Sequence, residues 1–325
     1  MPKVLILGAT GYVGKRVADT LVRSGQHQVY GVARSSTKAK ELALAEVTPV
    51  ICEDPINSPE PYLDVVRAQN IDIIVDLAGP GPDSAKFLQH AKAIAQERAD
   101  SYKAAGLYKT PELGFIYCSG TWVHGSSDKA VNDLDIAHEG AATPPGKLVA
   151  WRTGLENSIL DSYDLLDIAI VRPGLIYGRE NTIWSPFILP LLQAAQKGDT
   201  DSVKVNLEPE GRPGLIHVDD VATGFQCAIE KLSLISGSST YPVFDLVTSQ
   251  ESMAGIFDAL ARTWDFKGKV DLIGAGDDLF AQAMSTTFHG SSARARQLLG
   301  WEPKRLGGFV ADAHLYGNAF ASQHS

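Results

Sequence analysis

Short apolar runs alternate with amphipathic stretches through the first half of the chain. Residues 3–7 form an apolar run that a glycine-rich turn follows, and residues 12–23 repeat apolar side chains at helical spacing. Residues 84–105 also suit a helix, and further apolar runs predict buried strands at 28–33, 47–52, 71–78, 115–119 and 167–171. Apolar strands that alternate with amphipathic helices are typical of βαβ units. The pattern therefore predicts an α/β fold of the Rossmann type, a doubly wound parallel sheet.

The rhythm becomes less regular after residue 173. Helical spacing recurs, and short apolar runs at 242–247 and 269–273 predict two more strands. The helical stretches are 183–197, 218–232, 292–299 and 306–320. We expect residues 1–173 to form the sheet domain, with 213–235 packing back on it. Residues 174–325 should form mainly a smaller C-terminal lobe.

Charge and composition narrow the class of partner. The chain of 325 residues carries 29 Lys and Arg against 38 Asp and Glu, a formal net charge of −9 at pH 7. This balance argues against nucleic acid, which needs a basic face, and against an anionic membrane surface. No apolar run approaches the roughly 18 residues of a membrane span, and the N-terminus lacks the features of a secretory signal. We expect a cytoplasmic protein with a small-molecule partner, and a homodimer is compatible with this.

The turn after the first strand carries candidate chemistry. Gly8, Gly11 and Gly14, with Thr10, Tyr12 and Val13 between them, lie where the first strand ends and the first helix begins. In such a turn one glycine allows the sharp bend, one lets backbone approach a pyrophosphate, and one lets helix and strand pack closely. The helix N-terminus then offers unpaired N–H groups to the phosphates. The turn predicts that residues 1–173 bind a dinucleotide, which leaves 174–325 to bind substrate.

Several ordered segments resemble the extended, epimerase/dehydratase-like branch of the short-chain dehydrogenase/reductase superfamily. They are the glycine turn, Leu77-Ala78-Gly79, the segment 115–125, Arg172-Pro173 with Tyr177-Gly178, the segment 216–222, and Leu298–Pro303. The resemblance implies an NAD(P)-dependent oxidoreductase. It also implies cofactor contacts from Leu77, Ala78, Gly79, Ser119, Arg152 and Pro173.

The chain departs from that family at its catalytic positions. The family uses Ser or Thr with a Tyr-x-x-x-Lys pair, but here Leu148 takes the Tyr position, Arg152 the Lys position and Gly120 the Ser/Thr position. Leucine has no proton to give, and the guanidinium does not titrate near neutral pH. Three interpretations stay open: a redox enzyme with a relocated proton donor or none, a non-redox isomerase, lyase or cyclase on the same fold, and a non-catalytic NADP-binding regulator.

Two strand ends bear on which cofactor is bound. Arg34 follows the second strand, twenty residues after Gly14, where NAD-specific sites place a carboxylate on the ribose 2′-hydroxyl. An arginine there accommodates a 2′-phosphate, so we expect NADP in preference to NAD. Asp54 ends the third strand, where the family places an acidic residue near the adenine.

The remaining candidates for catalysis are Thr121, His124, Arg152 and Tyr177. Thr121 could donate to a substrate oxygen, His124 could supply a proton, and Arg152 could hold the cofactor ribose without moving protons. Three tryptophans expected near the cleft favour a small apolar or aromatic carbonyl or alcohol as substrate; they are Trp122, Trp151 and Trp184. Arg179 and Arg212 could serve a second pyrophosphate, as a nucleotide sugar would need. The eight histidines show no ligand spacing, so no metal is expected.

Overall fold

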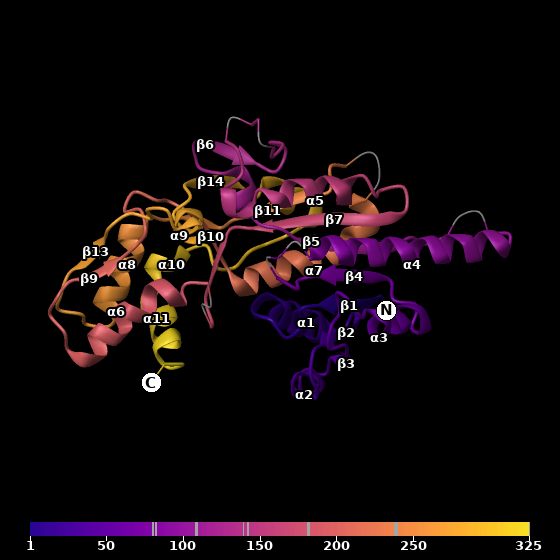
Figure 1. Ribbon diagram of the computed structural model, residues 1–325, viewed down its shortest axis with the longest axis horizontal. Coiled ribbons are helices and arrows are strands. Elements are labelled where there is room, and N and C mark those ends of the chain that lie inside the picture. Colours follow the sequence, from indigo (N-terminus) through magenta and orange to yellow (C-terminus); the bar gives the residue numbers. More distant parts are fainter. Residues whose placement is uncertain are drawn as a thin grey trace.

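A seven-stranded parallel sheet forms the centre of the molecule (Figure 1). The computed structural model describes residues 1–79, 81, 83–107, 110–138, 140–141, 143–180, 183–236 and 240–324. Every neighbouring pair of strands in this sheet runs parallel. In spatial order the strands are β11 (Val243–Leu246), β7 (Leu166–Pro173), β5 (Leu113–Cys118), β4 (Ile73–Asp76), β1 (Lys3–Leu7), β2 (Gln28–Ala33) and β3 (Thr48–Ile51). The predicted α/β fold is confirmed.

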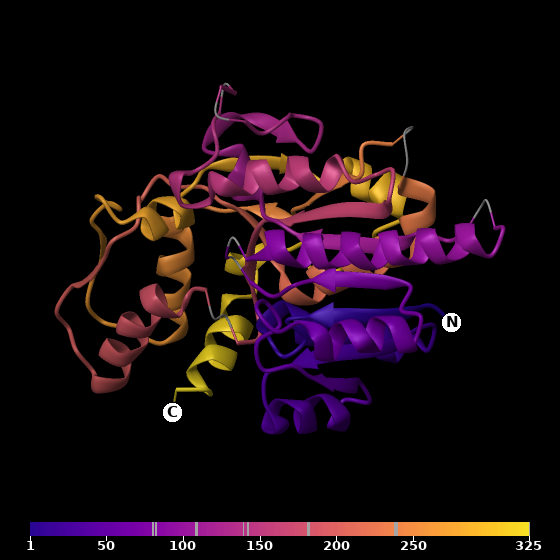
Figure 2. The ribbon, with the colours of Figure 1, turned by 45° about the vertical axis from the view of Figure 1, so that its right-hand side comes forward.

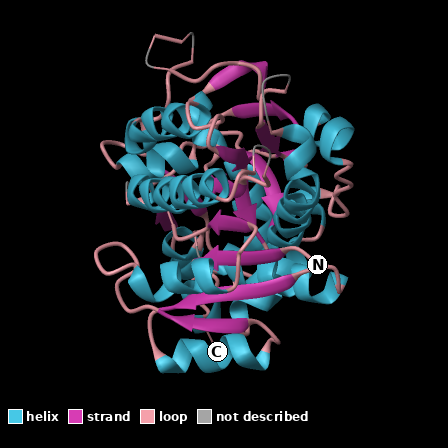
Figure 3. Ribbon diagram, turned by 90° about the vertical axis from the view of Figure 1, so that its right-hand side faces the viewer, coloured by secondary structure: helices cyan, strands magenta, loops and turns pink. Residues whose placement is uncertain are grey.

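Helices cover both faces of the sheet, as the view along its edge shows (Figure 3). One apolar core joins the sheet to α1 (Tyr12–Ser24), α2 (Ser36–Leu44) and α7 (Val218–Ile235). The other joins it to α3 (Glu60–Ala68), α4 (Ser84–Ala104) and α5 (Trp151–Leu160). The strands are buried on both sides, which explains why they read as continuous apolar runs rather than as alternating ones.

A second lobe lies beside the carboxyl-end edge of the sheet, at the left in Figure 2. Its apolar core is built from α6 (Ser185–Lys197), α8 (Met253–Thr263), α9 (Leu279–Met284), α10 (Gly308–Ala311) and α11 (Ala313–Ala321). The described residues also form three small sheets outside the main one. The first joins β8 (Leu175–Tyr177), β10 (Gly214–His217) and β12 (Ser249–Gln250). The other two pair β9 (Val203–Val205) with β13 (Val270–Leu272) and β6 (Ser127–Asn132) with β14 (Phe288–Ser291). None of the helices in the described part of the chain is long and apolar enough to cross a membrane.

The expected boundary at residue 173 divides the chain less cleanly than the sequence pattern suggests. Helix α7 packs on the sheet domain through Phe225, Ile229 and Leu232. Strand β11 is the seventh strand of the main sheet, although the pattern assigns residues 242–247 to the second lobe. The predicted helix at 292–299 is a π-helix over Ala295–Leu299 whose apolar side packs on the same core. The chain therefore returns to the first domain after it has begun the second.

Candidate functional site

A cavity of about 380 Å³ opens at the carboxyl ends of the strands, between the two lobes. It lies at the edge where open α/β sheets bind their ligands. Residues from the glycine turn, the end of β5, α5 and the end of β7 line it; they are Tyr12, Val13, Ser119, Gly120, Thr121, Trp122, Arg152, Pro173, Gly174, Leu175, Ile176 and Ile183. The structure thus brings six predicted site residues together: Tyr12, Val13, Ser119, Thr121, Arg152 and Pro173.

The glycine turn is built by close backbone contacts. Gly8 has a φ of +79°, and a Cβ added there would lie 2.3 Å from the carbonyl oxygen of Leu77. A Cβ on Gly14 would lie 2.1 Å from the carbonyl oxygen of Gly8. Gly11 differs, because an added Cβ would meet only the Gly8 carbonyl oxygen, at 3.2 Å. Gly8 and Gly14 are therefore required by the fold, and Gly11 is the position that leaves room for a ligand.

The turn also delivers the N-terminus of α1 to the cavity edge. Gly11 is the N-cap of this helix and provides no side chain to satisfy its first N–H groups. Thr10 lies inside the same turn, and Leu77–Gly79 pass directly beside Gly8. The hydroxyl of Tyr12 donates to the carbonyl oxygen of Gly178 and so connects the turn to the second lobe. This arrangement can cradle a pyrophosphate, which fits the dinucleotide that the sequence predicts.

Hydroxyl groups follow the end of β5. Ser119 and Thr121 are buried, and the hydroxyl oxygen of Ser119 has no hydrogen-bond partner. Thr121 begins a short 3₁₀-helix, Thr121–His124, which also places the Trp122 ring in the cavity wall. Either hydroxyl can donate a hydrogen bond to a ligand oxygen, and neither ionises near neutral pH.

Arg152 supplies the one charged side chain among the residues that line the described cavity. It is 7% exposed and lies in the first turn of α5, with its guanidinium carbon 5.6 Å from the Trp151 ring. Leu148, four residues earlier, is 36% exposed and does not line the cavity. A Cβ on Gly120 would lie 2.8 Å from a terminal guanidinium nitrogen of Arg152. The absence of a side chain at Gly120 therefore makes room for Arg152.

Arg34 and Asp54 lie at neighbouring strand ends, away from this cavity. Arg34 is exposed directly after β2, and within the described chain no hydrogen bond or ion pair engages it. Ser35 beside it caps α2 by accepting from the backbone N–H of Lys38. The Asp54 carboxylate accepts hydrogen bonds from Asn57 and the N–H of Ile56, and the Asn57 side chain helps to hold its pKa low. Asp54 thus organises its own loop, whereas Arg34 is free to meet a ligand.

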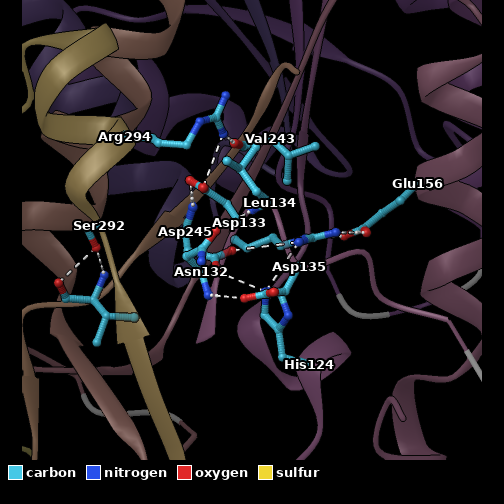
Figure 4. Close-up of polar contacts among 12 residues, drawn as sticks. His124, Asn132, Asp133, Leu134, Asp135, Glu156, Val243, Asp245, Ser292 and Arg294 are labelled. Carbon is cyan, nitrogen blue, oxygen red and sulfur yellow. Dashed lines mark hydrogen bonds and ion pairs between the residues drawn. The ribbon is translucent and has the colours of Figure 1, made fainter. Parts of the chain in front are cut away.

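The structure does not bring His124 to the cavity. Its ring is buried, stacks on Phe288 with centroids 5.4 Å apart, and lies 2.9 Å from Asp245 through Nε2 (Figure 4). Arg172 lies 3.3 Å from the same nitrogen and is held by both carboxylate oxygens of Glu156. His124 therefore anchors the end of the 3₁₀-helix that carries Thr121 and Trp122. We assign it this positioning role.

The buried network continues beyond Asp245. The backbone N–H of Asp245 donates to Asp133, and Arg294 pairs with Asp133 at 3.2 Å while donating to the carbonyl oxygen of Val243 (Figure 4). These contacts join β6, β11 and the segment before the π-helix. No pattern in the sequence predicts a role for Asp133, Asp245 or Arg294. They are separated along the chain and share no motif, so only the fold reveals them.

Tyr177 is also outside the cavity. It is fully buried, and its ring packs edge-on against His217, Phe309 and Tyr316 at centroid distances of 5.0–5.5 Å. Burial raises its pKa strongly, so it is a poor proton donor at this position. Trp184 is buried in the second lobe, where its indole donates to the carbonyl oxygen of Ile176. Among the three tryptophans expected at the cleft, Trp122 lines the cavity and Trp151 stacks on Arg152.

The two arginines considered for a second pyrophosphate do not line the cavity either. Arg179 is half-exposed and pairs with Asp219 at 2.8 Å. Arg212 is exposed beside β10, where its backbone contacts Thr287 and Gln250. The cavity therefore has Arg152 as its cationic contact.

One buried carboxyl near the site had no sequence signal. Asp76 ends β4, beside Leu7 of β1 and Tyr117 of β5, and burial raises its pKa to about 6. One of its oxygens accepts from the N–H of Ala78, and the other has no partner. No cluster of three or more metal-ligating side chains occurs among the residues the structure describes.

Comparison with known proteins identifies the same fold. The family model described as "NAD dependent epimerase/dehydratase family" matches residues 4–243. No curated protein sequence matches the chain. Among solved structures, a UDP-glucuronic acid 4-epimerase from Bacillus cereus, in complex with UDP-glucuronic acid and NAD, aligns over 99% of this chain and 100% of its own, with 17% identity and a TM-score of 0.66.

Two further structures are similar to the same extent. A dTDP-glucose 4,6-dehydratase from Bacillus anthracis str. Ames, in complex with NAD, covers 99% of this chain and 97% of its own, with 13% identity and a TM-score of 0.68. A UDP-glucose 4-epimerase from Thermotoga maritima, with UDP-glucose, covers 99% and 100%, with 18% identity and a TM-score of 0.67. At these identities the likeness shows the fold and leaves the substrate open.

Proposed function

The chain belongs to the NAD dependent epimerase/dehydratase family. We propose that it is an NADP-dependent oxidoreductase acting on a small apolar or aromatic carbonyl or alcohol. The observation that carries the proposal is the position of the cavity. It lies next to the glycine turn at the carboxyl ends of the strands, and its walls are mainly apolar.

The residues present fit a dinucleotide. Gly11 leaves open space in front of an uncapped helix N-terminus, and the Ser119 hydroxyl and the Nε of Arg152 are buried without partners. Polar groups buried in this way are expected to meet a bound molecule, since an unsatisfied donor is costly. The turn 8–14 with Leu77–Gly79 would hold the pyrophosphate side, and Ser119, Arg152 and Pro173 the nicotinamide side. The cofactor supplies hydride transfer when it is bound.

The preference for NADP rests on Arg34. Its guanidinium is exposed at the end of β2 and makes no ion pair with a described residue, so it can pair with a 2′-phosphate. We expect Arg34→Ala to weaken NADP binding about tenfold to a hundredfold, because a charge-assisted hydrogen bond contributes about 1.5–3 kcal/mol. NAD binding should change little. Calorimetric titration of both dinucleotides measures this.

The matched control is Arg23→Ala, which removes an exposed arginine at the far end of α1. It should leave the affinities for NADP and NAD unchanged. An equal loss of both affinities in Arg34→Ala would contradict the assignment of the 2′-phosphate contact.

Among the described residues that line the cavity, none is a strong proton donor. Besides Arg152, the titratable group in this lining is Tyr12, whose hydroxyl donates to the carbonyl oxygen of Gly178. Burial raises the pKa of Tyr12 well above its ordinary value. Ser119 and Thr121 can donate hydrogen bonds but not protons at neutral pH. A missing general acid typically lowers a rate about 10²–10⁴-fold, so carbonyl reduction should be slow. The same observation favours a second candidate, a non-redox step on the same fold.

Turnover assays separate the two candidates. Purified protein is incubated with NADPH and a panel of aromatic and alicyclic aldehydes and ketones, and with NADP⁺ and the matching alcohols, while nicotinamide absorbance is followed. Stoichiometric consumption of cofactor supports the oxidoreductase. Substrate conversion without net change of the cofactor supports the non-redox enzyme. Tight cofactor binding with no conversion across the panel and nucleotide sugars would contradict both.

A further inference from the structure

The guanidinium of Arg152 packs on the Trp151 ring but has no hydrogen-bond acceptor and no counter-ion among the described residues. None of its five N–H groups donates a hydrogen bond to a described residue, and no described carboxylate lies within 4.0 Å of it. The residue is nevertheless only 7% exposed. Its Nε is fully enclosed, and the cation lines the cavity against the face of Trp151. The enclosed Nε has lost water without gaining an acceptor, and the cation has no counter-ion among the described residues.

The carboxylates in the same region are engaged elsewhere. Glu156, one turn along α5, binds Arg172 through both oxygens. Asp76 lies on the neighbouring strand, accepts from Ala78, and has its pKa raised to about 6 by burial. Leu148, four residues before Arg152, has no hydroxyl group that could accept a hydrogen bond from the cation. Ribose hydroxyls could accept hydrogen bonds from Arg152, but they carry no charge to balance it.

We propose that the substrate carries a carboxylate on its apolar or aromatic body, in addition to the reacting carbonyl or alcohol, and that this carboxylate pairs with Arg152. This deepens the proposed function and rests on it for the assignment of the cavity to substrate. The planar fork of a guanidinium matches a carboxylate with two parallel hydrogen bonds. Two of the five N–H groups of Arg152 suffice for this pair, so the others stay available to the cofactor ribose. The Ser119 and Thr121 hydroxyls can add donors, and Val13, Trp122, Leu175, Ile176 and Ile183 would enclose the apolar body.

A phosphate or a nucleotide sugar fits this cavity less well. Such groups carry more charge and more acceptor oxygens, and they are held by several cations, yet Arg179 and Arg212 both lie outside the cavity. The net charge of −9 also repels anions at long range. An acid must therefore be captured by a local charge, and a single carboxylate balances a single arginine.

Gly120 completes the site. Its backbone runs so close to Arg152 that a Cβ would lie 2.8 Å from a guanidinium nitrogen and 3.7 Å from the carbonyl oxygen of Pro173. A serine at position 120 should displace the guanidinium while leaving its charge in place. Gly120→Ser therefore tests the position of the cation separately from its presence.

The experiment compares acids with neutral molecules of the same shape. Benzoate, cinnamate, phenylacetate and cyclohexanecarboxylate are each titrated against the corresponding amide, with and without NADPH, by calorimetry and by tryptophan fluorescence, which Trp122 makes sensitive to the cavity. We expect at least one acid to bind about tenfold or more tightly than its amide, as expected for a charge-assisted pair. Phenyl phosphate should bind more weakly than benzoate.

Variants assign the effect to Arg152. Arg152→Met, which keeps the apolar stem against Trp151, should abolish the preference for acid over amide, and Arg152→Lys should retain part of it. Arg179→Gln, which removes an arginine outside the cavity, should leave the preference unchanged. Without ligand, Arg152→Met should melt at a higher temperature than the parent, because it removes a buried N–H without an acceptor and a cation without a counter-ion. A purely structural arginine would give the opposite shift.

Several results would overturn the proposal. The first is that every acid binds only as tightly as its amide, or that no acid binds. The second is that Arg152→Met keeps the preference for acids or melts at a lower temperature than the parent. The third is that phenyl phosphate or UDP-glucose binds more tightly than the acids. Cofactor binding is measured in the same samples. If the parent protein binds NADPH but prefers no acid, only the assignment of a carboxylate to Arg152 fails. If the parent protein does not bind NADPH, the proposed function itself is refuted.

Discussion

Gly11→Val should abolish dinucleotide binding and leave the protein folded. The backbone at Gly11 is extended, with a φ of −81°, so valine can adopt it. Its Cβ would lie 3.2 Å from the Gly8 carbonyl oxygen, a close contact that a backbone shift of a few tenths of an ångström relieves. The rest of the side chain would project into the space where the pyrophosphate approaches the turn. We expect NADPH affinity to fall by about a hundredfold or more, about 3 kcal/mol, with little change in the melting temperature.

Gly14→Ala provides the contrast within the same turn. Its Cβ would lie 2.1 Å from a backbone carbonyl oxygen, which cannot move away as a flexible side chain could. This variant should lose stability as well as cofactor affinity, even though alanine normally stabilises a helix relative to glycine. Calorimetric titration and thermal unfolding measure both quantities. Unchanged NADPH binding in Gly11→Val would mean that the phosphates bind elsewhere.

Arg172→Met should lower the free energy of unfolding by about 3–5 kcal/mol, because it leaves Glu156 buried without a counter-ion. Arg172 is fully buried and pairs directly with Glu156. A terminal nitrogen of Arg172 also lies 3.8 Å from a carboxylate oxygen of Asp245. Burial by itself would lower the pKa of this arginine, but the two carboxylates more than offset that effect and raise it. The loss of stability is measured by urea unfolding.

Two companions show that the burial of the pair sets the size of this effect. Arg179→Gln breaks an exposed arginine–carboxylate pair with Asp219 and should cost less than about 1 kcal/mol. The double variant Arg172→Met with Glu156→Leu should recover at least half of the lost stability, since an apolar pair can replace a buried ion pair. A double variant no more stable than the single one would show that Arg172 acts through Asp245 and His124 instead.

The lining of the cavity was predictable where its residues lie at the ends of apolar strands. The glycine turn, Ser119, Thr121 and Pro173 each follow a recognisable apolar strand, and the carboxyl ends of parallel strands meet at one edge of the sheet. Arg34 is predicted as a cofactor contact by its distance from the turn, which a βαβ unit keeps nearly constant, and this stays a prediction. These predictions needed only local structure and the rule that ligands bind at that edge.

His124 and Tyr177 show where this reasoning ends. Both follow strands and belong to matched segments, yet one ring stacks on Phe288 beside Asp245, 121 residues further along the chain, and the other packs among aromatic rings of the second lobe. Which way a strand-end side chain points depends on partners that arrive from distant segments. Those partners, rather than the segment itself, decide whether a ring faces the cavity.

The sequence alone determined the fold class, the glycine turn after the first strand and the absence of the Tyr-x-x-x-Lys pair, because periodicity, a glycine turn and residue identity are local properties. The tertiary structure decided that β11 completes the main sheet, that Glu156 pairs with Arg172, and that Arg152 has no counter-ion among the described residues. Pairing of charges depends on which helices and strands pack together, over separations that no local pattern records. Whether a cation is satisfied by its own chain or left for a ligand is settled only when the chain is folded.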